Sequence, residues 1–123
     1  MAVIIQGCNP DYLLQQIYSS VSQNDIDTWL FDAEGDFTYL PPQWYCHAWL
    51  RPRRMLFASE PNKLVFGIVQ SQKWRMTPSL YSVYHSRFVE MLLTHFDGKF
   101  QDVTITALLN KQYDILPKDY PHN

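Results

Sequence analysis

The sequence predicts an α+β domain: a mainly antiparallel sheet of about five to six strands, with two helices packed on one face. Three observations lead to this prediction. The chain of 123 residues is 46% hydrophobic and 18% charged, so it can bury a core without cross-links. Apolar residues recur at helical spacing in two segments, and about five others have strand character. The connections between them are as short as those of hairpins, which favours antiparallel pairing and the order α-β-β-β-β-β-α-β.

The first helix is predicted to begin at Asn9 and to end at residues 22–25. Asn9 suits the N-cap position, Pro10 suits the first helical position, and Asp11 suits the positive end of the helix dipole. The apolar residues that follow share the spacing of one helical face. They are Leu13, Leu14, Ile17, Tyr18 and Val21.

Four strands are expected next, each bounded by turn residues or prolines. Gly35, in the turn at residues 32–36, can adopt the positive φ that a tight hairpin requires. Pro52 breaks the third strand, and the fourth has the continuous apolar character of a strand buried on both faces. The predicted strands are residues 26–31, 37–40, 45–50 and 64–70.

Residues 77–96 allow two interpretations. Thr77 and Pro78 can begin one long helix, but residues 79–84 have the β-branched and aromatic composition of a strand. We expect a strand at residues 79–84 and a helix at residues 86–96.

The C-terminal region is predicted to complete the sheet. Residues 103–109 alternate well enough to form the last strand. Residues 111–123 contain two prolines and are expected to form a loosely ordered tail. The single α+β domain is therefore expected to span residues 1–110.

Charge is distributed unevenly along the chain. Residues 1–50 hold six acidic residues and no Lys or Arg, whereas residues 51–100 have a balance of +5. Such asymmetry indicates an interaction surface, although the two regions can also neutralise each other in the fold. An acidic surface steers a basic partner toward it. The residues expected to bind that partner are Asp25, Asp27, Asp32, Glu34 and Asp36.

Catalytic and metal-binding patterns are incomplete. The best catalytic set consists of His85 as a base, Arg87 as an anion-binding group and Glu90 as an orienting group. Arg87 and Glu90 also fit a surface ion pair. Asp32, Glu34 and Asp36 resemble half of a calcium loop without its bidentate glutamate. The adjacent Cys46 and His47 lack zinc-ligand spacing. We expect neither a metal nor a cofactor, and the sequence leans away from an enzyme.

Aromatic and basic residues provide two further candidate sites. Trp29, Trp44, Trp49 and Tyr84 can line a small-molecule pocket, although core packing explains the same rings. Basic residues interleave with a tryptophan as in nucleic-acid-binding proteins, but the isoelectric point of about 6.0 disfavours such a partner. These basic-patch residues are Arg51, Arg53, Arg54, Lys73, Trp74 and Arg75.

The sequence favours a cytoplasmic protein. No apolar run approaches the roughly 18 residues of a membrane span, and no basic residue precedes the short apolar stretch at the N-terminus. Cys8 and Cys46 are too few for a disulfide framework, so reduced thiols are expected.

Three stretches resemble small uncharacterised bacterial proteins of mobile elements, including integron gene cassettes. They are IDTW leading into GDFT, QW followed by AWLRP, and VYHSRFVEMLLTHFD, and the similarity covers residues 12–108. The family usually has a glycine where Ser86 stands, so either Ser86 tolerates a tight strand–helix corner or the corner is built differently here. The resemblance implies an accessory role such as toxin neutralisation, phage defence or ligand sequestration, with no residue roles to carry over.

The sequence therefore predicts a non-catalytic interaction protein of immunity or defence type, with a protein partner and compatible with a homodimer. The alternatives are a small-molecule binder with the aromatic pocket, and a hydrolase-like enzyme using His85, Arg87 and Glu90.

Overall fold

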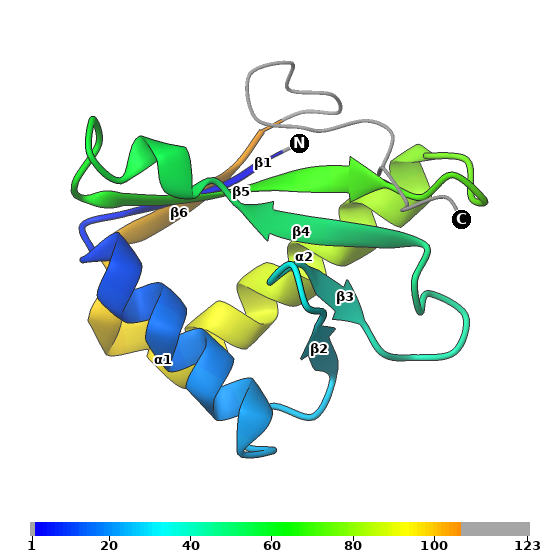
Figure 1. Ribbon diagram of the computed structural model, residues 1–123, viewed down its shortest axis with the longest axis horizontal. Helices are drawn as coiled ribbons and strands as arrows, with labels where there is room; N and C mark the ends of the chain where they lie inside the picture. The colour runs from blue at the N-terminus through cyan, green and yellow to red at the C-terminus, as the bar shows by residue number, and fades with distance from the viewer. Residues whose placement is uncertain (1, 107–123) are drawn as a thin grey trace.

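The computed structural model describes residues 2–106, which form one six-stranded sheet and two α-helices (Figure 1). This confirms the predicted α+β class. No helix within these residues is long and apolar enough to cross a membrane. The elements are β1 (Ala2–Gln6), α1 (Pro10–Ser22), β2 (Trp29–Phe31), β3 (Phe37–Tyr39), β4 (Ala48–Pro52), the 3₁₀ turn η1 (Arg54–Leu56), β5 (Lys63–Gln70), α2 (Pro78–Phe96), the 3₁₀ turn η2 (Asp97–Lys99) and β6 (Asp102–Ile105).

The strand order in the sheet is β2-β3-β4-β5-β1-β6, and every neighbouring pair is antiparallel. Strands β2 to β5 form the meander that short connections favour. Strand β1 then inserts between β5 and β6, with Ile4 opposite Val65 on one side and opposite Thr104 on the other. The order places β2 and β6 at the two edges.

Both helices cover the same face of the sheet (Figure 1). Side chains alternate across a strand, so Leu64, Phe66 and Ile68 of β5 all face the helices and join their core. Aromatic rings form a large part of this core, in a chain that is 15% aromatic. Phe88 of α2 meets Phe66 with ring centroids 4.7 Å apart and Trp29 at 5.1 Å.

Helix α1 begins as its sequence predicts. Asn9 accepts a hydrogen bond from the Tyr12 amide at 3.1 Å through its side chain, and Pro10 occupies the first helical position. This bond satisfies one of the amide groups that a helix leaves unpaired at its start.

The predicted strand at residues 79–84 is wrong, because these residues belong to α2. Thr77 accepts from the Leu80 amide at 3.1 Å through its hydroxyl, so α2 begins at Pro78, about two turns before the helix start expected at residue 86. Leu80, Tyr81 and Tyr84 lie on one helical face and are buried, and burial of these side chains outweighs their strand propensity.

Strand β1 is an element that the sequence analysis did not predict, and several predicted strands differ in length. The strand expected at residues 26–31 is only Trp29–Phe31, and the one expected at residues 45–50 begins at Ala48. The last predicted strand extends to residue 109, and its part beyond residue 106, like the predicted tail, lies outside the described residues.

Candidate functional site

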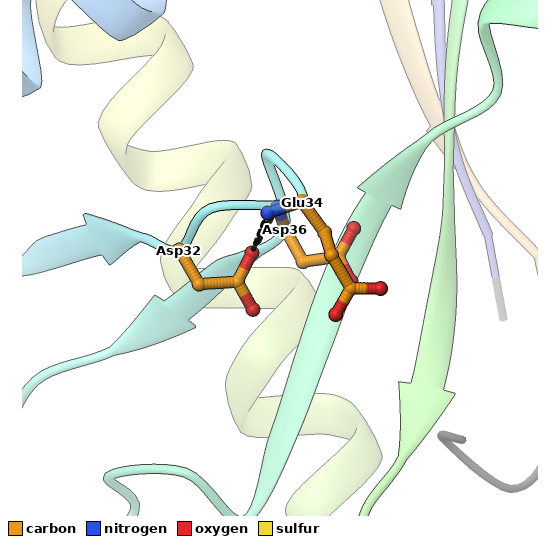
Figure 2. A group of neighbouring side chains, drawn as sticks. All are labelled: Asp32, Glu34 and Asp36. Carbon is orange, nitrogen blue, oxygen red and sulfur yellow. Dashed lines mark hydrogen bonds between the residues drawn. The ribbon is translucent and has the colours of Figure 1, made fainter. Parts of the chain in front are cut away.

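The hairpin between β2 and β3 holds the acidic cluster that the sequence singles out. One carboxylate oxygen of Asp32 accepts from the amides of Glu34, at 2.9 Å, and Asp36, at 3.1 Å. Gly35 has φ of +82°, which closes the turn. Figure 2 shows the three carboxyl groups gathered on one side of the hairpin. Oxygens from all three lie within 4.8 Å of one another.

Arg51 of β4 neutralises part of this cluster. Its Nε and Nη2 donate to the two carboxylate oxygens of Asp36 at 2.9 and 2.8 Å, and Nη2 also reaches Glu34 at 3.2 Å. Asp36 is fully buried, and its hydrogen bond is the main cause that raises the pKa of Arg51. A divalent cation that bound an oxygen of Asp36 would have to compete with Arg51, which donates to both of them. At this point the acidic and basic regions of the chain do neutralise each other.

Tyr18 of α1 fixes the tip of the hairpin. Its hydroxyl donates to the Gly35 carbonyl at 2.8 Å and accepts from Arg54 at 3.1 Å, and the Arg54 guanidinium lies 5.6 Å from the centre of the ring. Burial raises the pKa of Tyr18, with Arg54 acting in the opposite direction. The acidic turn is therefore held rigidly against the helical layer.

The remaining acidic candidates lie around the edge strand β2, where Asp32 is half-buried and the other three are exposed. Two precede the strand and two follow it, and Leu30 in the middle of β2 is 43% exposed. Asp36, which the sequence placed in this set, is buried beneath Arg51 and is not available to a partner. We call the accessible set the acidic rim; it consists of Asp25, Asp27, Asp32 and Glu34.

The three catalytic candidates are not brought together. His85 is fully buried, and its Nδ1 lies 2.6 Å from the Tyr81 carbonyl. Arg87 and Glu90 pair at 3.2 Å on the exposed side of α2. Positions 85 and 87 are about 200° apart around a helix, so the imidazole and the guanidinium face different surroundings.

The four aromatic candidates do not line a common cavity. Trp29 and Tyr84 are buried in the core, where they pack edge to face at 5.7 Å. Trp49 lies between Ala48 and Leu50 of β4, which both face the core. Side chains alternate along a strand, so Trp49 faces away from the helices. Trp44 is half-buried and borders a shallow cleft of about 360 Å³, together with Tyr39 and Arg87.

A cleft of about 700 Å³ lies at the beginning of α1, at a position that the sequence did not indicate. Cys8, Asn62, Lys63 and Lys99 contribute to its walls. Burial raises the pKa of the Cys8 thiol, so the thiol stays protonated and is a weak nucleophile. Lys63 forms an ion pair with Glu60 at 2.9 Å.

The loop at residues 41–47 is held by buried and partly buried hydrogen bonds. Tyr84 donates to the Trp44 carbonyl at 2.5 Å, and the Thr38 hydroxyl, 3.0 Å from that of Tyr84, accepts from the Cys46 amide at 3.1 Å. Cys46 has φ of +59°, which is uncommon for a residue with a side chain. This arrangement fixes the backbone on the N-terminal side of His47.

His47 forms an aromatic cluster with two tryptophans. Its ring stacks on Trp74 with centroids 3.8 Å apart and planes 21° apart, and it meets Trp44 edge to face at 6.3 Å. Burial lowers the pKa of His47 below its usual value of 6.5. No local sequence pattern reveals this cluster, because Trp74 lies in a different loop, after β5.

The predicted basic patch is divided between two places. Arg51 and Arg54 are engaged at the acidic hairpin. Lys73 and Arg75 follow β5, near the end of the β4–β5 ladder at which Ala48 pairs with Gln70. Arg53 lies beyond the opposite end of this ladder.

The described residues thus carry an acidic rim around the edge strand β2 and an aromatic cluster elsewhere. Comparisons with protein-family models, curated proteins and solved structures find no match.

Proposed function

We propose that this protein is a non-catalytic binding protein that captures a basic protein partner on its acidic rim. The observation that carries the proposal is the position of four carboxylates around the edge strand β2, two before it and two after it. The pair before the strand is exposed. After the strand, Asp32 is half-buried and Glu34 is exposed beside Arg51. Such a field accelerates the encounter with a basic surface and disfavours acidic partners.

The chemistry of the β2 edge supports docking as well as steering. Leu30 offers an exposed apolar side chain between the two pairs of carboxylates. An apolar centre with a polar border is the usual anatomy of a protein interface. The hydrogen bonds of Asp32 and Tyr18 hold the hairpin in place, so little conformational freedom is lost on binding.

The proposed role extends to an accessory protein of bacterial mobile elements, of immunity or defence type, acting in the cytoplasm. A basic toxin such as a nuclease is the kind of partner whose charge fits the rim. Self-association through a sheet edge is compatible with this role.

The experiment that tests the proposal is partner capture at low ionic strength. The protein is immobilised and exposed to bacterial extract, and the retained proteins are compared with those held by a variant whose rim is neutral. The substitutions preserve side-chain shape, and Asn retains the oxygen that caps the hairpin at position 32. They are Asp25→Asn, Asp27→Asn, Asp32→Asn and Glu34→Gln.

The matched control removes the same number of acidic charges away from the rim. The substitutions are Asp11→Asn, Glu60→Gln, Asp97→Asn and Asp102→Asn. We expect basic proteins that are retained by the native protein and by this control, but not by the rim variant. Equal retention by both variants, equal loss from both, or no retention by the native protein contradicts the proposal.

A further inference from the structure

Trp74 is an exposed aromatic side chain with an ordered partner on one face. It lies in the loop between β5 and α2 and is 47% exposed, although it stacks on His47. Because the near-parallel imidazole covers one face of the indole, the exposed surface belongs to the rest of the ring. Trp74 thus lies at the surface, stacked on a half-buried imidazole.

The backbone beneath this stack is held in place before any ligand binds. The Tyr84 and Thr38 hydroxyls bind the loop at Trp44 and Cys46, and Cys46 has an unfavourable positive φ. Backbone strain that buried contacts hold in place is concentrated at ligand-binding sites. Here the strained residue is Cys46, directly before His47, so the same contacts position the imidazole on which Trp74 stacks.

The charge around this stack is positive, in contrast to the acidic rim. The segments that build the region, residues 37–50 and 64–86, contain two charged residues, Lys73 and Arg75, and no acidic one. Both cations are exposed and are adjacent to Trp74 in the chain. The net charge of −2 disfavours nucleic acid for the molecule as a whole, but contacts with phosphate depend on the local charge.

We propose that Trp74, stacked on His47 and flanked by Lys73 and Arg75, binds an unpaired nucleotide. The indole stacks with the base, and the two cations contact phosphate. Every base has a π face, so an aromatic platform next to cations accepts unpaired nucleotides with little sequence preference. Free nucleotides and single strands share this chemistry. The site is separate from the acidic rim, so the proposal stands or fails independently of partner capture.

The first test measures the anisotropy of a labelled oligothymidylate of about 15 nucleotides at about 50 mM salt. We expect Trp74→Ala to weaken binding about tenfold or more and Trp74→Phe to restore part of it, because stacking is retained. Tyr12→Ala is the matched control, since Tyr12 is an aromatic residue on α1 that is 58% exposed. Urea unfolding of each variant confirms that it is folded.

The second test separates phosphate contacts from stacking. Lys73→Gln with Arg75→Gln should reduce the slope of log affinity against log salt by about 1.4, or about 0.7 for each cation. Arg53→Gln with Lys99→Gln removes equal charge elsewhere and should leave the slope unchanged.

Competition identifies the form of the ligand. Displacement of the oligonucleotide by thymidine monophosphate indicates a free nucleotide, and displacement only by unlabelled oligothymidylate indicates a strand; both support the site. The proposal is overturned if the native protein does not bind the oligonucleotide, if Trp74→Ala binds as tightly, or if inorganic polyphosphate of equal charge competes equally well.

Discussion

Arg51→Met is expected to destabilise the fold more than any single change at an exposed ion pair. The substitution removes the guanidinium that donates to both oxygens of Asp36, a fully buried residue, while Met fills much of the same volume. Removing one partner of a buried ion pair costs about 3–5 kcal/mol. Arg51 is 29% exposed, so water already screens its charge, and we expect about 3 kcal/mol.

Urea denaturation at neutral pH measures this change as a free energy of unfolding. In a thermal scan, about 3 kcal/mol corresponds to a decrease in Tm of about 10 °C for a chain of this size. Arg87→Met is the control because Arg87 pairs with Glu90 on the exposed side of α2, where a pair contributes about 0–1 kcal/mol.

The double variant Arg51→Met with Asp36→Asn tests the cause. If the destabilisation arises from a buried carboxylate without its Arg51 counter-charge, neutralising Asp36 should recover part of the loss, with a coupling of about 1–3 kcal/mol. A cost below about 1 kcal/mol for Arg51→Met, or no coupling between the two substitutions, would refute the reasoning.

Three further predictions concern the framework of the two candidate sites. Tyr84→Phe should lower the free energy of unfolding by about 1–3 kcal/mol in urea, because the loop at residues 41–47 loses a buried donor; an unchanged midpoint contradicts this. Gly35→Ala should cost more than about 1 kcal/mol, because φ is +82° and the new Cβ would lie 2.6 Å from a tyrosine hydroxyl, whereas Gly98→Ala faces open space and should be neutral or stabilising. Because the folded-state pKa of His47 is below 6.5, the unfolded chain binds the proton more readily, so stability should fall as pH drops below about 6.5. His47→Gln should reduce that dependence in urea titrations at several pH values, and an identical pH profile would contradict the assignment.

The elements that sequence reasoning located correctly are those whose signals are local. Asn9 and Pro10 mark the start of α1 because capping involves only neighbouring residues. The strand β5 is evident because its apolar run leaves no solvent-facing side. Residues 79–84 were misassigned because composition does not record that Leu80 and Tyr84 share one buried helical face.

The candidate sites show the same division. The acidic residues could be identified from the sequence, but the burial of Asp36 by Arg51 could not, because the pairing depends on where β4 lies next to β3. The catalytic candidates were close in sequence, yet the helical rotation between His85 and Arg87 separates them.

The sequence by itself determined the fold class, the first helix, the central strand and the uneven charge, since each depends on composition or on neighbouring residues. Only the tertiary structure decided that β1 lies between β5 and β6, which acidic residues stay accessible, and that His47 stacks on Trp74. The physical reason is that these features depend on contacts between distant residues. The sheet and its core select such contacts, and no local periodicity encodes them.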